Sequence, residues 1–242
     1  MLLDALLNLI YPDRCFVCSV AIARRQDCGI CSVCWNKALA LRINPPRCSS
    51  CGLPFQSFDD DSEHLCGNCI LRVPPYSGAR SFGYYTAELS SVIRELKFNG
   101  RRNTVRLLAP LLAGTFLMNW NREDFDALVP VPLHPRRRRE RGYNQSELLT
   151  RCVARQLTLP CCEGLARVRP TAPQVGLTDS QRQENVRNAF RCRNAGQISG
   201  RRILLVDDVM TTGATVASAA QALLDGGALR VSVLTVARAG KW

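Results

Sequence analysis

The spacing of apolar residues along the chain changes near residue 75. Over 11–72 the apolar residues keep neither a helical nor a strand period, and Cys, Pro and short polar turns predominate. A Pro-Pro pair at 74–75 closes this part, and such pairs interrupt regular structure. The pattern predicts two domains, one over 1–75 that starts with a short helix and one over 76–242.

Beyond residue 75 the pattern alternates between strand and helix periods. Leu89, Val92, Ile93 and Leu96 keep helical spacing, for example. The expected elements are strands over 81–86, 126–131, 165–168, 202–206 and 231–236, and helices over 88–98, 104–120, 146–157 and 214–224. Pro110 should bend or interrupt the second of these helices. Alternating strands and helices predict an α/β fold of the Rossmann-like kind, with a mostly parallel sheet and right-handed crossovers.

The chain is basic, with a formal net charge of +12 over 242 residues. Such a balance favours phosphate-bearing partners, namely nucleotides, pyrophosphate or nucleic acid. No membrane span is expected. The apolar stretch over 1–10 is too short to cross a bilayer and has no basic leader region, and charged and proline residues interrupt 105–120. We therefore expect a soluble protein.

Thirteen cysteines are present, and eight of them form four Cys-x-x-Cys turns in the N-terminal part. The turns are Cys15-x-x-Cys18, Cys31-x-x-Cys34, Cys48-x-x-Cys51 and Cys66-x-x-Cys69. Each turn brings two thiolates together, which is half of a tetrahedral zinc shell. The pattern predicts two structural Zn²⁺ ions. A single zinc, disulfides or redox-active thiols are the alternatives, and an interleaved pairing of the turns stays open.

The remaining cysteines receive no role. They are Cys28, Cys152, Cys161, Cys162 and Cys192. Because so much thiol must stay reduced, the composition points to a reducing compartment, hence the cytoplasm. Four thiolates leave no open coordination position, so these zinc ions should stabilise the fold rather than catalyse a reaction.

The segment over 203–215 joins an apolar strand to a helix through a polar turn. It reads Ile-Leu-Leu-Val-Asp-Asp-Val-Met-Thr-Thr-Gly-Ala-Thr. Free N–H groups and a partial positive charge at the helix start suit a phosphate, and ligands of open α/β sheets bind at this end of the strands. Asp207 and Asp208 would repel a phosphate unless they bind ribose hydroxyls, directly or with Mg²⁺. The alternative is an ordinary strand, turn and helix with a polar cap.

This segment resembles the phosphoribosylpyrophosphate (PRPP) signature of the type I phosphoribosyltransferases. The resemblance implies that Asp207 and Asp208 hold the ribose 2′- and 3′-hydroxyls. It places the 5′-phosphate on the turn over 211–215. The PRPP-binding set expected on this basis is Asp207, Asp208, Val209, Met210, Thr211, Thr212, Gly213, Ala214 and Thr215, joined by Arg138, Arg141 and Arg182 from other segments.

A second basic segment follows Val129-Pro130-Val131-Pro132-Leu133, and it holds five arginines within 136–141. The pyrophosphate loop of the transferases has this position after the first core strand. The arginines could neutralise pyrophosphate, contact nucleic acid, or form a solvated loop. Arg141, next to Gly142, is the best candidate to act in catalysis beside Asp207 and Asp208.

The segment over 167–190 is polar and has no clear period. In the transferases a loop here closes over the substrate and excludes water. Long polar segments are otherwise often unstructured, so both interpretations stay open.

Together these motifs resemble the ComF family over about 12–238. They are the paired cysteine turns, Val-Pro-Val-Pro-Leu, Arg-Gly-Tyr-Asn-Gln, Gln174 with Arg182 and Asn185, and the acid-pair signature. The family is bacterial and linked to natural competence, so the resemblance implies a cytoplasmic protein with a double zinc ribbon and a phosphoribosyltransferase domain.

Catalysis is less well specified than binding. Thr211 stands where purine transferases carry a third acid, so the usual general acid or base is missing. A hood over the acceptor could come only from 76–125 or the cysteine-rich part. Three hypotheses remain: a PRPP- and Mg²⁺-dependent transferase with an unknown acceptor, a nucleotide- or single-stranded-DNA-binding protein, and a scaffold that docks a competence helicase or DNA-channel protein.

Overall fold

The computed structural model describes residues 13–22, 28–55, 64–170 and 179–240. The helix expected near the N-terminus lies outside the described residues.

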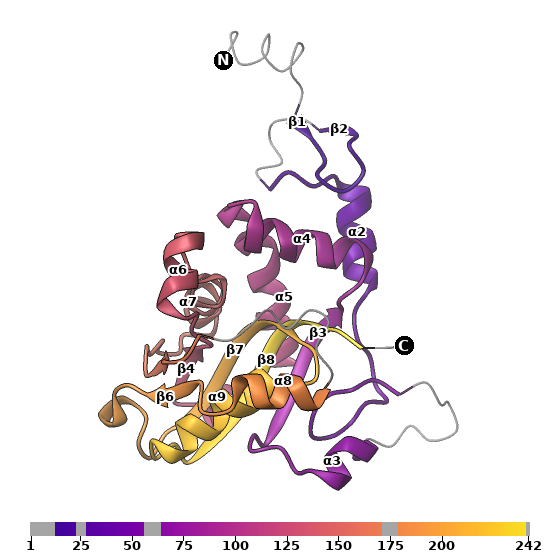
Figure 1. Cartoon of the computed structure of the whole chain (residues 1–242). Helices are drawn as coiled ribbons and strands as arrows, with labels where there is room; N and C mark the ends of the chain where they lie inside the picture. Colours follow the sequence, from indigo (N-terminus) through magenta and orange to yellow (C-terminus); the bar gives the residue numbers. More distant parts are fainter. Residues whose placement is uncertain (1–12, 23–27, 56–63, 171–178, 241–242) are drawn as a thin grey trace.

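A four-stranded parallel sheet with the order β3-β8-β7-β4 forms the centre of the molecule (Figure 1). Its strands are β3 (Gly78–Tyr84), β4 (Ala127–Pro130), β7 (Arg202–Met210) and β8 (Arg230–Arg238). In the register, Val206 lies opposite both Pro130 and Leu234. The predicted parallel α/β fold is confirmed, although β7 is longer than predicted and includes the acid pair.

Helices cover both faces of this sheet because its strands are apolar on both sides. Leu204 and Val206 of β7 pack in one core with α4 (Ala87–Phe98), α5 (Val105–Leu117) and α7 (Gln145–Leu157). Ile203 and Leu205 face the opposite core, which contains α9 (Ala214–Asp225). Pro110 lies inside α5, and the four predicted helices are confirmed to within a few residues.

The basic segment over 135–141 is a short helix rather than the predicted loop. Helix α6 (Pro135–Arg141) starts with a proline at its first position, and His134 Nδ1 accepts from the backbone N–H of Arg136. It ends at Gly142, whose φ of 78° is the left-handed conformation that favours glycine. The arginines therefore point in several directions around a helix.

The remaining elements are short. They are β1 (Asp13–Arg14), β2 (Ala21–Ile22), α2 (Ser32–Ala40), α3 (Gly67–Leu71), 3-10 turns at Arg102–Thr104, Arg122–Asp124 and Ala195–Gln197, β5 (Leu165–Arg167), α8 (Asp179–Val186) and β6 (Phe190–Cys192). Strands β5 and β6 pair antiparallel outside the main sheet. Part of the polar segment over 167–190 is thus regular structure.

The cysteine-rich part packs directly on the α/β fold. Cys15, Cys31 and Cys34 share a core with α4 and α5. Cys48, Cys51, Cys66 and Cys69 share the other core with strands of the sheet and α9. Residue 75 therefore marks a change in composition, and a domain boundary at this position remains a prediction.

Candidate functional site

Asp207 and Asp208 lie side by side near the carboxyl end of β7, and both are buried. Asp207 Oδ1 accepts from Ser146 Oγ at 2.7 Å and from the backbone N–H of Asp208 at 2.9 Å. Lys97 Nζ lies 3.0 Å from Asp208 Oδ1. Asp208 Oδ2 is buried and has no hydrogen-bond partner in the part of the chain that the structure describes. This oxygen therefore retains unused hydrogen-bond acceptor capacity.

Burial raises the pKa of Asp207 to about 7, and the neighbouring charge of Asp208 adds to the effect. The hydrogen bond from Ser146 and the charge of Lys97 oppose the shift. A buried pair of carboxyls holds two negative charges only with help from donors or cations. Ser146 and Lys97 supply part of this help.

The acid pair lies in the wall of a cavity of about 1040 Å³. The cavity has a second wall from α4, which contributes Arg94, Lys97 and Phe98, and a third from the segment that leads into α6. The turn after β7 contributes Thr211, Gly213 and Thr215. Residues far apart in the sequence therefore meet at the carboxyl end of the parallel strands, where α/β proteins bind ligands.

The turn after β7 is tightly built. Gly213 has a φ of +84°, and a Cβ added there would lie 2.8 Å from Met210 Cε. Helix α9 begins at the next residue, so its first backbone N–H groups lie at this turn. The Ala214 N–H also bonds Thr212 Oγ1 at 3.4 Å. Such a turn at a helix start can bind an anion.

The arginines of α6 divide between the cavity and the surface. Arg136, Arg137 and Arg141 line the cavity, whereas Arg138 pairs with Glu147 at 3.0 Å and is not among the lining residues. Arg141 donates to Gln145 Oε1, and its guanidinium lies 5.3 Å from the centre of the Phe98 ring. Burial lowers the pKa of Arg141, and the charge of Asp208 opposes this effect.

Several residues of this site were not predicted from the sequence. Lys97 and Phe98 come from α4, Ser146 comes from the first turn of α7, and Arg167 comes from β5. Helix α4 lies within 76–125, the part from which a hood was expected, and coverage of an acceptor by it stays a prediction. The Arg-Gly-Tyr-Asn-Gln motif ends one residue before Ser146 and was the available signal for it.

The structure describes only part of the predicted closing loop. Gln174 lies outside the described residues, and so does the side chain of Arg182 in α8. Arg169 donates to the backbone carbonyls of Glu184, Asn185 and Arg187. Closure of this segment over a ligand remains a prediction.

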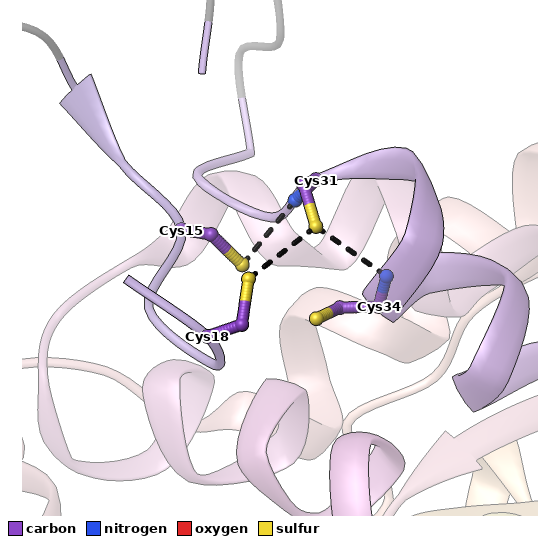
Figure 2. A group of neighbouring side chains, drawn as sticks. All are labelled: Cys15, Cys18, Cys31 and Cys34. Carbon is purple, nitrogen blue, oxygen red and sulfur yellow. Dashed lines mark hydrogen bonds between the residues drawn. The ribbon is translucent and has the colours of Figure 1, made fainter. Parts of the chain in front are cut away.

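The eight cysteines of the four turns form two groups in the described structure. One group is Cys15, Cys18, Cys31 and Cys34 (Figure 2), and the other is Cys48, Cys51, Cys66 and Cys69. Within each group all sulfur atoms lie within 4.8 Å of one another. Consecutive turns therefore pair, and the interleaved arrangement is excluded.

Both groups fit a structural zinc ion. In the first, the backbone N–H groups of Cys31 and Cys34 each lie 3.4 Å from a cysteine sulfur, as expected around thiolates. In the second, burial raises the pKa of Cys51 to about 11 although Arg238 lowers it. Four ionised thiolates in such a place need a cation. Cys28 bonds the Asn103 carbonyl at 3.6 Å and belongs to neither group.

Within the described residues, no helix is both long and apolar enough to span a membrane.

Comparisons with known proteins agree with this architecture. Residues 6–74 match the double zinc ribbon domain and residues 145–241 match the phosphoribosyl transferase domain. The DNA utilization protein YhgH of Salmonella typhi is 38% identical over 95% of this chain and 99% of its own length. Competence protein F of Haemophilus influenzae is 33% identical over 93% and 97%, and competence protein ComFC of Bacillus subtilis is 30% identical over 88% and 86%.

Among solved structures, glutamine PRPP amidotransferase from B. subtilis matches 59% of this chain and 30% of its own chain, with 20% identity and a TM-score of 0.41.

Proposed function

We propose that this chain, which belongs to the ComF family of competence proteins, binds PRPP or a related nucleotide with Mg²⁺ over Asp207 and Asp208. The observation that carries the proposal is the buried acid pair in the wall of a cavity whose other charged lining residues, apart from Glu140, are cationic. Asp208 Oδ2 has no partner among the described residues, and two carboxyls beside an anion-binding turn need a ligand that also brings hydroxyls or a cation.

Each part of the site has a role in this proposal. Asp207 and Asp208 accept hydrogen bonds from the ribose hydroxyls, and the turn over 211–215 holds the 5′-phosphate with its N–H groups and hydroxyls. Arg137 and Arg141 bind the pyrophosphate group. When bound, Mg²⁺ would neutralise charge on the phosphates beside the carboxylates.

The reaction that fits this site is transfer of the phosphoribosyl group. The bond between ribose C1 and the pyrophosphate oxygen breaks, pyrophosphate leaves with the bonding electrons, and C1 forms a bond to a nucleophilic acceptor that loses a proton to solvent. Arg141 stabilises the leaving group by its charge. Helix α4, which lines the cavity, is the proposed cover over the acceptor.

The proposed setting is competence or DNA use in the bacterial cytoplasm. Similar proteins are named for these processes. A second candidate function is binding of single-stranded DNA, favoured by the exposed arginines of α6, of which Arg139 lies outside the cavity lining. In a third, the chain is a scaffold for a competence helicase or DNA-channel protein.

Salt dependence separates the first two functions. DNA that releases counterions from several phosphates should bind at least about tenfold more weakly when salt rises from 50 to 200 mM, whereas Mg-PRPP held by carboxylates and hydroxyls should change much less. Fluorescence anisotropy with labelled oligo-dT measures the affinity for DNA, and calorimetry measures the affinity for Mg-PRPP. Arg139→Gln should weaken only DNA binding, and Arg141→Gln should weaken PRPP binding. Salt-sensitive DNA binding without PRPP binding would instead support the second function.

The pH dependence of binding tests the role of Asp207. Ribose hydroxyls bond the ionised carboxylate, so affinity for Mg-PRPP should rise as pH increases through the raised pKa of Asp207, near 7. The Ser146 hydroxyl lowers that pKa, so Ser146→Ala should move the midpoint to higher pH. Calorimetry between pH 6 and 8.5 measures this shift against Ser218→Ala, whose hydroxyl bonds the Val186 carbonyl instead. Identical profiles for the two variants would contradict the assignment.

A further inference from the structure

The guanidinium of Arg238 lies between the second cysteine group and the end of strand β7. Arg238 is only 5% exposed, at the end of β8. Its Nη1 donates to the Cys51 carbonyl at 2.6 Å and lies 3.1 Å from Met210 Sδ, and its Nη2 lies 3.6 Å from Cys51 Sγ. One side chain thus contacts both a cysteine of the four-thiol group and a residue of the acid-pair signature.

Met210 continues this contact to the phosphate-binding turn. The Met210 side chain is buried, and its methyl carbon would lie only 2.8 Å from a Cβ added at Gly213. The Tyr76 hydroxyl approaches the same position to 3.4 Å. Gly213 can adopt its φ of +84° without strain. The Met210 methyl group therefore packs against the turn at Gly213 and leaves no room for a side chain there.

The Cys48–Cys51 turn, which Arg238 contacts, is held against the sheet. The Ala79 N–H of β3 donates to the Ser50 carbonyl at 2.7 Å. Gly52 packs so closely that an added Cβ would lie 2.4 Å from the Ala79 carbonyl oxygen. The Cys48–Cys51 turn has no room to move toward β3, so Arg238 contacts a rigid point.

The charge of Arg238 explains why metal matters to this contact. A buried guanidinium is unfavourable unless negative groups or acceptors surround it. Among the described residues no carboxylate pairs with Arg238, and its Nε has no hydrogen-bond partner. The Cys51 sulfur carries negative charge when it ligates a metal ion. Metal binding thereby provides a negative partner for Arg238.

We infer that Arg238 is a positioning residue that couples metal binding at the second cysteine group to the shape of the phosphate-binding turn. The nature of the ligand rests on the function proposed above. The inference concerns the second group, because Arg238 contacts Cys51 of that group, whereas the first group packs in the opposite core.

The test compares Arg238→Met with Arg80→Met in the full-length, zinc-loaded protein. Arg80 is a matched control, because its Nη1 donates at 3.0 Å to the Ser49 carbonyl of the same cysteine turn. Hydrogen exchange over 209–215, zinc content and affinity for Mg-PRPP are measured for both. Arg238→Met should speed exchange in this segment and weaken binding by about tenfold, a typical effect of losing an outer-sphere contact, with Arg80→Met near wild type.

The outcomes separate this inference from the proposed function. If the wild type binds no PRPP, the proposed function fails, and the exchange rates still decide the coupling. If Arg238→Met loses zinc or folds poorly, Met210→Leu replaces it, since this variant removes the sulfur contact without altering the cysteine turn. Unchanged exchange over 209–215 in the folded variant, or an equal change in Arg80→Met, would overturn the coupling.

Discussion

The Asp208→Asn variant is expected to lose at least about 100-fold in affinity for Mg-PRPP. Asp208 is buried beside Asp207 at the cavity, and its Oδ2 has no partner among the described residues. Hydrogen bonds to a charged group contribute about 1.5–3 kcal/mol each, and about 2.7 kcal/mol is a factor of 100. An amide keeps the shape of the side chain but loses the charge and one acceptor. Calorimetry with PRPP at saturating Mg²⁺ measures the loss.

The same substitution should leave the fold intact. Removing the charge of Asp208 relieves repulsion with Asp207, and the partly exposed Lys97 can turn to solvent. Asp126→Asn is the matched control, because Asp126 also pairs with a cation, Arg202 at 2.8 Å, but lies near the start of β4 and outside the cavity lining. Asp126→Asn should bind normally. An Asp208→Asn variant that binds within about threefold of wild type would contradict the assignment of the ribose site.

The Cys69→Ser variant is expected to lower the melting temperature by more than about 10 °C. All four cysteines of its group are buried, and they share a core with strands of the sheet and α9. Structural zinc contributes on the order of 10 kcal/mol in zinc-finger peptides. A chain of this size loses about 2–4 °C per kcal/mol. The serine hydroxyl is a poor zinc ligand, so a large part of this contribution is lost.

The control for this experiment is Cys152→Ser. Cys152 is half-buried on α7 and belongs to neither cysteine group. Thermal melts followed by circular dichroism, together with zinc per chain by elemental analysis, should show loss of zinc and stability in Cys69→Ser alone. If the two variants have the same melting temperature and the same zinc content per chain, the second group has no structural metal.

Local sequence patterns predicted most of the fold. Strands and helices alternate along the chain, and a strand-to-helix signature covers 203–215. Each of these patterns extends over a few residues, so it can be recognised without knowledge of the tertiary structure. Cysteine spacing could not decide the pairing of the four turns, because consecutive and interleaved pairs supply the same number of thiolates to each metal site. The structure decides it by bringing the sulfur atoms of consecutive turns within 4.8 Å.

The sequence of helix α6 contains helix start and stop signals, although a loop was predicted there. Pro135 at its first position and Gly142 after its last are the expected start and stop of a helix. The run of arginines between them was predicted as a loop because of its position after the first core strand. Like charges close together on a helix also repel one another. Salt bridges from Arg136 to Glu140 and from Arg138 to Glu147 reduce this repulsion.

Other features of the site depend on packing between distant segments. Lys97 reaches Asp208 only because α4 lies across the end of the sheet, and Arg238 meets a cysteine 187 residues earlier in the chain. No local period or motif reports such contacts. The acid pair and the turn after β7 were therefore identifiable from the sequence, and their role in binding ribose and phosphate stays a prediction. The α4 wall and the connection to the second cysteine group could not be predicted from the sequence.

The central claim is tested most directly by calorimetric titration of the zinc-loaded, full-length protein with PRPP in the presence of Mg²⁺. We expect one site with a Kd on the order of micromolar, within the usual range for enzyme substrates, and no measurable binding by the Asp207→Asn/Asp208→Asn double variant. A folded, zinc-loaded wild type that releases no heat at millimolar PRPP would contradict the proposed function.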